Sequence, residues 1–466
     1  MWRCVFCALF FAVGTTGARA LQPQPIFEDE AIRKMSSTRV DMQKQATGIV
    51  VGVIDSKGPH IISYGTMGSR DKRPVNGDTL FDIGSITKVF TALLLADMAQ
   101  RGEVRLDDPV AKYLDAKKVK LPERGGKQIT LLDLATHTSG LPLRPTNLVS
   151  KDPNDKYRDY TVDLMYECLS SFVLTRDIGT KYEYSNLGYG LLGHVLEKRM
   201  GMTYGDLVEN RITRPLEMKD TRIGLTPALK GRMAVGYNNE LTPIPSEWHF
   251  GVLQSAGAFS STANDLLKFL GALLGFKQSP LLPAMKSMLD FRRPGGMRPS
   301  TEIALAWNVY LDGGQEVVWK NGSVGGYRSF IGFDPKAAMG VVALANAQTA
   351  VGADDIGLHF LDEHIPVDLH IPKPHKEISL RPEILDRYIG RYQFSPTDIM
   401  AVTREGNHLV GQLLDGQRFE MFGEGDHDFF MKIADAQVTF ESSGQGLATV
   451  AIWHQGGQDQ RGERIE

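Results

Sequence analysis

The stretch "QEVVWKNGSVGGYRSFIGFDPKAAMGVVALAN", residues 315–346, decides the class of fold. Its apolar runs are separated by a glycine-rich bend and by an Asp-Pro turn, so it predicts three consecutive strands. Far upstream, "ATGIVVGVIDSKGPHIISYGT", residues 46–66, predicts a hairpin around a Ser-Lys-Gly turn. Helical patterns lie between these segments. We therefore expect an α+β domain in which one antiparallel sheet is assembled from both ends and flanked by helices.

The helical patterns are strongest in three places. "KVFTALLLADMAQRG", residues 88–102, predicts a long helix that ends at its final glycine, and a shorter helix is expected after Asp107. The other two patterns are "LGYGLLGHVLEKRMG", residues 187–201, and "STANDLLKFLGALLG", residues 261–275. These helices are expected to cover the sheet.

A change of composition marks a second domain. Residues 366–375, "PVDLHIPKPH", contain three prolines and no periodicity, which is typical of a linker. Beyond it, residues 376–466 show short alternating segments separated by Gly, Asn and Asp turns, so we expect an all-β unit, a small barrel. The first domain then extends over residues 21–365.

The first twenty residues, "MWRCVFCALFFAVGTTGARA", are typical of a secretory signal peptide. Arg3 gives a basic start, an apolar run follows, and an A-x-A pattern predicts cleavage after Ala20. No later run approaches the roughly 20 apolar residues that a transmembrane helix needs. The expected product is therefore a secreted or periplasmic protein, in which Cys168 is the remaining cysteine and is expected to be buried and structural.

Composition and motif absences narrow the function further. The net charge of −3 and the pI near 6.4 argue against a nucleic-acid partner or an anionic membrane. The eleven histidines form no H-x-H or H-E-x-x-H pattern, so no metal or other cofactor is expected, and His137 is interpreted as structural. No G-x-S-x-G elbow is present, which argues against an α/β-hydrolase.

A serine and a lysine stand out at the start of an apolar helix, "FDIGSITKVFTALLLADM", residues 81–98. Ser85 and Lys88 are three residues apart, which places them on one helix face. The helix N-terminus and partial burial both lower a lysine pKa, and a neutral lysine can accept the serine proton. The alternative is a capping serine beside a lysine that reaches solvent.

Two further motifs change the balance between these alternatives. "EYSNLGY" contains Tyr184 and Asn186 two residues apart, so in an extended stretch both would project to one side. "WKNGSVGGY" places Lys320 at the end of an apolar strand, followed by Gly322, which permits close approach of a ligand. Ser-x-x-Lys with such later elements is the signature of penicillin-binding proteins and serine β-lactamases.

On these motifs the sequence resembles the serine β-lactamase and penicillin-recognising family, in its class C-like branch with a Tyr-x-Asn second motif. The resemblance covers most of residues 40–350 and includes "LLDLATHTSGLPLR", "RPLEMKDT" and "VVALAN". It implies a two-lobed fold with an all-helical lobe beside the sheet and the site between them. The C-terminal segment from "LDRYIGRYQF" onward resembles a lipocalin-like domain.

The resemblance implies a role for each motif residue. Ser85 is the implied nucleophile and Lys88 its proton acceptor. Tyr184 is implied as the base or proton relay that activates the hydrolytic water. Asn186 and Lys320 are implied to hold the substrate amide and the hydrogen-bond network.

The resemblance also implies a substrate-binding set and an oxyanion hole formed by the backbone N–H groups of Ser85 and Ser323. The implied substrate contacts are Arg144, Asn321, Gly322, Ser323 and Asn346. One departure stands out, because Asn321 occupies a place where the family most often has a Thr or Ser that bonds the substrate carboxylate. Recognition of a β-lactam carboxylate is therefore in question, whereas acyl transfer is not.

We therefore expect an exported serine hydrolase that acts through an acyl-enzyme on a cyclic or peptide-like amide. A class C-like β-lactamase is the first expectation. A D-alanyl-D-alanine carboxypeptidase or endopeptidase and a small-ester esterase are the alternatives, and a binding protein that is acylated without turnover is an alternative of another class. The expected partner is a small-molecule amide or a cell-wall peptide, and an apolar ligand of the barrel is left open.

Overall fold

The structure is a computed structural model of the 466-residue chain. It describes residues 29–465 except 153–154, 245–247, 296–300, 313–314, 350–351, 370–374, 396–397, 414–417, 433–435, 443–445 and 456–457. The expected signal peptide, residues 1–20, lies outside the described residues and stays a prediction.

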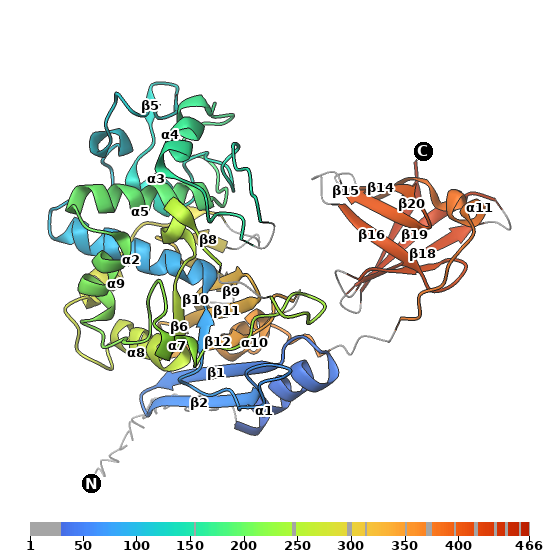
Figure 1. The fold of residues 1–466 in the computed structure, drawn as a ribbon, viewed down its shortest axis with the longest axis horizontal. Helices are drawn as coiled ribbons and strands as arrows, with labels where there is room; N and C mark the ends of the chain where they lie inside the picture. The colour runs from blue at the N-terminus through green and yellow to red at the C-terminus, as the bar shows by residue number, and fades with distance from the viewer. Residues whose placement is uncertain are drawn as a thin grey trace, which may run out of the picture.

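The first domain is built on one antiparallel sheet of eight strands in the order β2-β1-β12-β11-β10-β9-β8-β7 (Figure 1). These strands are β1 Gly48–Asp55, β2 Gly58–Gly65, β7 Arg293–Pro294, β8 Thr301–Ile303, β9 Asn308–Asp312, β10 Gln315–Val324, β11 Tyr327–Asp334 and β12 Met339–Ala345. Because β1 pairs with β12, the N-terminal hairpin joins the three strands of residues 315–346. The expected assembly of one sheet from both ends of the domain is confirmed.

Two short antiparallel pairs lie outside this sheet. They are β3 Leu80–Asp82 with β6 Ser260–Thr262, and β4 Glu123–Arg124 with β5 Lys127–Gln128. The β3–β6 pair holds the segment just before Ser85 beside the segment just before α8.

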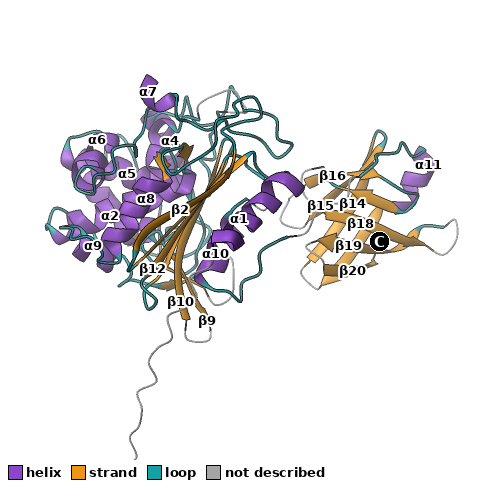
Figure 2. Cartoon of the chain, turned by 90° about the horizontal axis from the view of Figure 1, so that it is seen from below, coloured by secondary structure: helices purple, strands orange, loops and turns teal. Residues whose placement is uncertain are grey.

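Helices cover both faces of the large sheet (Figure 2). The α-helices are α1 Asp29–Ser37, α2 Thr87–Gln100, α3 Leu131–Ala135, α4 Val162–Ser171, α5 Asn186–Met200, α6 Tyr204–Val208, α7 Pro227–Lys230, α8 Ala263–Leu273, α9 Leu282–Ser287, α10 Asp354–Leu361 and α11 Pro382–Leu385. Short 3₁₀ or π turns are η1 Thr38–Met42, η2 Gly84–Ile86, η3 Val110–Tyr113, η4 Glu209–Thr213, η5 Gly251–Ala256 and η6 Asp386–Tyr388. The helix expected after Asp107 is thus only the 3₁₀ turn η3.

Strand alternation divides the buried side chains into two cores. Val50 and Leu344 pack with the helical lobe of α2, α5 and α8 on one face. Their neighbours Val51 and Ala343 pack with α10 on the other face. Burial on both sides explains why the strand sequences read as nearly continuous apolar runs.

Helix α2 is the centre of the helical lobe, and every residue from Thr87 to Met98 is buried. A helix that is apolar on all sides is suited to the interior of a domain. Its buried polar exceptions near the N-terminus, Lys88 and Thr91, therefore need specific partners.

The second unit is a closed antiparallel barrel in which consecutive strands are neighbours. Its strands are β13 Gly390–Ser395, β14 Asp398–Glu405, β15 His408–Leu413, β16 Arg418–Gly423, β17 Asp428–Phe430, β18 Ala436–Ser442, β19 Ala448–Gln455 and β20 Gln458–Arg464. The predicted α+β fold followed by an all-β barrel is confirmed. Buried side chains such as Tyr388, Tyr392, Phe429 and Phe440 form the hydrophobic core of this unit.

Candidate active site

The turn η2 that carries Ser85 is clamped to the sheet immediately before α2. Ser329 Oγ of β11 donates a hydrogen bond to Ile83 O, 2.8 Å away. Gly84 has a φ of +48°, and a Cβ atom there would lie 3.1 Å from Ser323 N. A glycine before the serine is thus required by both its conformation and the close approach of β10.

Lys88 lies one turn further along and is fully buried. Its Nζ is 3.1 Å from Ser85 Oγ, 2.8 Å from Asn186 Oδ1 and 2.6 Å from Ala256 O. Burial lowers the pKa of Lys88 well below its usual range, and the positive charge of Lys320 lowers it further. Deprotonation of Lys88 is therefore easier than that of an exposed lysine.

The three partners of Lys88 fix where its lone pair points. Asn186 Oδ1 and Ala256 O are carbonyl oxygens that can only accept hydrogen bonds. The two protons of a neutral amine satisfy these oxygens, and the lone pair is left facing the Ser85 hydroxyl. This arrangement is what removal of the serine proton by Lys88 requires.

Tyr184 completes the contacts of Ser85, because its hydroxyl donates to Ser85 Oγ at 2.6 Å. Burial raises the pKa of the Tyr184 phenol, so the resting group is neutral and donates a proton. Of the two roles implied by the resemblance, the geometry supports the relay and leaves the resting base to Lys88. The tyrosine ring lies between two amines, with Lys88 Nζ and Lys320 Nζ each 4.8 Å from its centre.

The second motif lies at the start of α5: Ser185 has extended backbone dihedrals, with φ −135° and ψ 116°, and the helix begins directly after it. Ser185 is the N-cap of α5, and its Oγ accepts a hydrogen bond from Gly188 N at 2.8 Å. Asn186 is therefore the first residue of a helix. The cap still directs Tyr184 and Asn186 to the Ser85–Lys88 pair.

The start of α5 is also tied to the loop that carries Arg144, because the backbone N–H of Asn186 donates to Leu143 O at 2.9 Å. Arg144 itself is exposed and has no hydrogen-bond or ion-pair partner among the described residues. It is next in sequence to Leu143, whose carbonyl contacts the second motif. Its expected role as a substrate contact stays a prediction.

Lys320 lies inside β10 rather than at its end, and only 3% of its surface is exposed. Burial lowers the pKa of Lys320 to about 8, while the negative charge of Asp354 opposes this change. Lys320 therefore carries most of its positive charge at neutral pH, next to the neutral Lys88.

Two backbone N–H groups meet where β10 passes η2. A Cβ atom on Gly322 would lie 3.0 Å from Ser85 N and 2.1 Å from Ile83 O. Together with the contact between Gly84 and Ser323 N, this brings the backbone nitrogens of Ser85 and Ser323 to the same narrow place. The arrangement is compatible with an oxyanion hole.

Some of the expected substrate contacts have partners within the protein, Asn346 and Asn321 among them. Asn346 is fully buried, and its side chain bonds Thr47, Gly48 and Met67, so its observed role is to join β12 to the start of β1. Asn321 Nδ2 donates to Asp354 Oδ2 at 2.6 Å. Contact of Asn346 with a substrate stays a prediction, and in this structure its buried side chain is held by these protein partners.

His137 is a site neighbour that the sequence interpretation undervalued. Its ring centre is 4.4 Å from that of Tyr184, and its Nδ1 accepts a hydrogen bond from Ser185 N at 3.0 Å. Burial, then the charges of Lys320 and Lys88, lower its pKa, so the ring is neutral. The sequence signal for His137 is its place between two threonines, just before Ser-Gly. A backbone acceptor such as Ala256 O has no such signal in the sequence.

A cavity of about 590 Å³ lies beside the end of β10, and Ser85, Lys88 and Tyr184 are not among its lining residues. Its lining includes Asp82, three residues before the nucleophile, and Gly325, two residues after Ser323. Trp248 and Tyr327 supply aromatic surface there.

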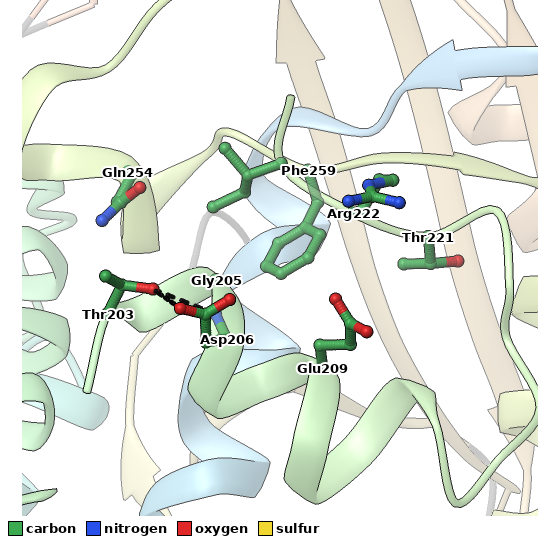
Figure 3. A pocket seen from close by; sticks show the side chains of 9 residues that line it. Thr203, Gly205, Asp206, Glu209, Thr221, Arg222, Gln254 and Phe259 are labelled. Carbon is green, nitrogen blue, oxygen red and sulfur yellow. Dashed lines mark hydrogen bonds between the residues drawn. The ribbon is translucent and has the colours of Figure 1, made fainter. Parts of the chain in front are cut away.

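A smaller cavity of about 210 Å³ lies next to it and shares Gln254 of η5 in its lining (Figure 3). Figure 3 shows Asp206 and Glu209 facing the ring of Phe259, with Arg222 beside it. Asp206 is held by the side chain of Thr203. None of the residues lining this cavity belongs to the Ser85 and Lys88 constellation, so we do not assign the reaction to it.

Comparisons with known proteins agree with this constellation. Residues 29–363 match the family model "Beta-lactamase", and residues 374–464 match "Domain of unknown function (DUF3471)". The chain is 29% identical over 356 residues to the D-alanyl-D-alanine-carboxypeptidase/endopeptidase AmpH of Escherichia coli K12, covering 72% of this chain and 89% of that protein. It is 28% identical over 382 residues to a beta-lactamase of the same strain, covering 74% and 95%.

A solved structure gives the same result. The class C beta lactamase from Rhodobacter sphaeroides superimposes with a TM-score of 0.60 at 28% identity, covering 71% of this chain and 99% of that one. The family model covers well over half of the chain, and the Ser85, Lys88 and Tyr184 constellation lies inside the matched range. The chain therefore belongs to the beta-lactamase family, as a serine hydrolase of the β-lactamase/D,D-peptidase type.

Proposed function

We propose that the protein hydrolyses a strained or peptide-like amide through an ester at Ser85, with Lys88 as the base and Tyr184 as the proton relay. The observation that carries this proposal is the position of Ser85 Oγ, 3.1 Å from Lys88 Nζ and 2.6 Å from the Tyr184 hydroxyl. A nucleophile within reach of a base and of a second proton carrier is the minimum that acyl transfer requires.

The reaction follows in two halves. Ser85 Oγ bonds to the carbonyl carbon as its proton passes to Lys88, and the developing oxyanion is stabilised by the N–H groups of Ser85 and Ser323. The C–N bond then breaks, and the leaving amine receives the proton through Lys88 and Tyr184. Water attacks the resulting ester, gives its proton to the same relay, and releases the acid product and the free Ser85 hydroxyl.

A β-lactam is the first substrate to test, in keeping with the class C-like expectation, and a D-alanyl-D-alanine peptide is the second. Two relatives carry these activities in their names, a beta-lactamase and a D-alanyl-D-alanine-carboxypeptidase/endopeptidase. A small ester is the third candidate. Export by the N-terminal segment and a lipocalin-like C-terminal barrel remain parts of the proposal. Among the described residues, no helix is long and apolar enough to cross a membrane.

The test is to incubate the protein and its Ser85→Ala variant with a chromogenic cephalosporin, a D-alanyl-D-alanine peptide and a nitrophenyl ester. We expect turnover of at least one substrate by the unchanged protein, a covalent adduct on Ser85 by intact mass spectrometry, and neither with the variant. Turnover that persists in Ser85→Ala would contradict the serine mechanism.

The same experiment distinguishes the binding-protein alternative. If that alternative holds, an adduct forms on Ser85 and remains without product release. Dialysis against a chelator is the companion measurement, and we expect it to leave the activity unchanged. Activity that is lost on dialysis and restored by zinc would exclude the proposed reaction.

A further inference from the structure

The face of β10 opposite Lys320 carries a carboxylate that belongs to the protein itself. Side chains alternate along a strand, so Asn321 and Ser323 leave β10 on the face away from Lys320. The connection from β12 to α10 covers that face. Gln348 Nε2 donates to Ser323 Oγ at 3.1 Å, and Asn321 Nδ2 donates to Asp354 Oδ2 at 2.6 Å.

Asp354 occupies donors that would otherwise be available to an anion. Besides Asn321, the Arg328 guanidinium lies 3.9 Å from Asp354 Oδ2, and Lys320 is close enough for the two charges to influence each other. One fifth of the Asp354 side chain is exposed, whereas its Oδ1 is buried without a hydrogen-bond partner among the described residues. A second carboxylate brought here would compete for the same donors and meet a like charge.

The neighbouring acidic residue does not share this role. Asp355 forms a two-point ion pair with Arg39, with N–O distances of 3.1 and 2.8 Å. Its charge is therefore compensated by Arg39 of η1, which lies on the same face of the sheet as α10, while Asp354 contacts β10.

We infer that Asp354, held on the Asn321 amide, is a specificity-determining residue that selects substrates whose leaving group carries no carboxylate beside the scissile bond. The substrate class is then an internal peptide-like amide or an ester, rather than a molecule that ends in a free carboxylate at this place. This inference rests on the proposed function and narrows it. It also gives the unusual Asn321 a physical role, because its amide can donate to a carboxylate across 2.6 Å.

The pH dependence of this selection has a defined sign. Burial raises the pKa of Asp354 to about 6, opposed by Arg328, Asn321 and Lys320 and supported by Asp355. Arg39, paired with Asp355, and Asp368, whose backbone contacts both of them, are further charged residues on this side. Below pH 6 Asp354 becomes neutral, so discrimination against a carboxylate decreases as the pH falls.

Matched pairs of substrates provide the test. One pair is an N-acylated D-alanyl-D-alanine and its C-terminal carboxamide, and the other is an acylglycyl ester of 3-hydroxybenzoate and that of 3-hydroxybenzamide. The measured quantity is the ratio of kcat/KM within a pair, because changes in Lys88 protonation affect both members equally. We expect the unchanged protein to favour the neutral member by about 10-fold or more, which is the effect of roughly 1.4 kcal/mol.

Two variants distinguish an effect of the Asp354 charge from an effect on folding. Asp354→Asn keeps a group that can accept from Asn321 but removes the charge, and it should shift the ratio at least about 10-fold toward the carboxylate substrate. Glu363→Gln, an exposed residue just beyond the other end of α10, should leave the ratio unchanged. The inference is overturned if the unchanged protein favours the carboxylate member, or if Asp354→Asn leaves the ratio as it was. Absence of any Ser85 adduct with all four substrates would instead contradict the proposed function.

Discussion

At the scale of single residues, the chemistry depends on an amine that is kept neutral. Burial and the charge of Lys320 both disfavour the protonated form of Lys88, and its two carbonyl partners direct the lone pair to Ser85. The neutral phenol of Tyr184 then has one task, the transfer of a proton to or from Ser85 Oγ.

Tyr184→Phe keeps the ring and removes the hydroxyl that contacts Ser85 Oγ. If the hydroxyl relays the proton of the hydrolytic water, deacylation should slow by about 10²–10⁴-fold, the usual size of general acid–base catalysis. The acyl-enzyme should then accumulate and be visible by intact mass spectrometry. Ser85→Ala, the control, should show no adduct. If Tyr184→Phe turns over substrate at the unchanged rate, Tyr184 has a packing role and takes no part in proton transfer.

The two lysines should give the activity a bell-shaped pH profile. The acidic limb reports protonation of Lys88, and the basic limb near pH 8 reports the loss of charge on Lys320. In Lys320→Met the basic limb near pH 8 should disappear. The acidic limb should move to higher pH, because the charge that opposes protonation of Lys88 is gone. An acidic limb that stays in place or moves to lower pH in kcat/KM measurements would contradict this coupling.

At the scale of elements, the site is a junction of three segments that the sequence separates by about a hundred residues or more. The sheet and the helices α2, α5 and α8 could be predicted, because their apolar periodicity is strong. The motif residues Ser85, Lys88 and Tyr184 could be predicted too, because their chemistry and order are distinctive. The contact between Asn321 and Asp354 could not, since Asp354 opens α10 and only the tertiary fold brings it to β10.

The conformation at the cap of α5 could not be predicted from the sequence either. A Tyr-Ser-Asn stretch can be extended or can start a helix, and the choice depends on whether Ser185 finds the N–H of Gly188. Backbone partners such as Ala256 O are set by how η5 packs on α2. No side-chain pattern encodes such a carbonyl.

The contact between β10 and η2 can be tested through Gly322→Ala. The added Cβ would lie 2.1 Å from Ile83 O, so the strand or the turn must shift and the N–H groups of Ser85 and Ser323 must separate. We expect kcat/KM to fall by about 10²–10³-fold, as when an oxyanion-hole donor is removed.

Gly322→Ala should also lower the free energy of unfolding by about 1–3 kcal/mol, the usual cost of overpacking. Urea unfolding measures this change. Gly205→Ala is the matched control, because a Cβ there has no atom within 4 Å. It should keep both the activity and the stability of the unchanged protein. Full activity in Gly322→Ala would show that the close approach of β10 has no catalytic role.

At the scale of the whole molecule, the two units have separate hydrophobic cores. The buried side chains of the first domain form two clusters on the faces of its sheet, and the barrel has a third cluster of its own. The linker expected at residues 366–375 stays a prediction. Asp368 O accepts hydrogen bonds from Arg39 and Gln43, so residues 366–369 are anchored to the first domain, and residues 370–374 lie outside the described residues.

This boundary leads to the last prediction, a comparison of two shortened chains. A chain of residues 21–369 keeps the first domain with its Asp368 anchor, and we expect it to fold and to retain the activity of the full chain, because every proposed catalytic residue precedes the boundary. A chain of residues 21–365 loses the Asp368 contacts. Arg39, whose side chain is fully buried, then lacks one acceptor, and Asp355 loses the donation from Asp368 N at 2.8 Å. Leaving such groups unpaired costs about 1–3 kcal/mol, so the shorter chain should unfold at a measurably lower Tm while its kcat/KM stays close to that of the longer one.

Circular dichroism melts and kinetics with the substrate found for the full chain provide both readouts. If residues 21–369 fold but lack activity, the barrel contributes to the site, and if both chains melt at the same temperature, the Asp368 anchor has no energetic role.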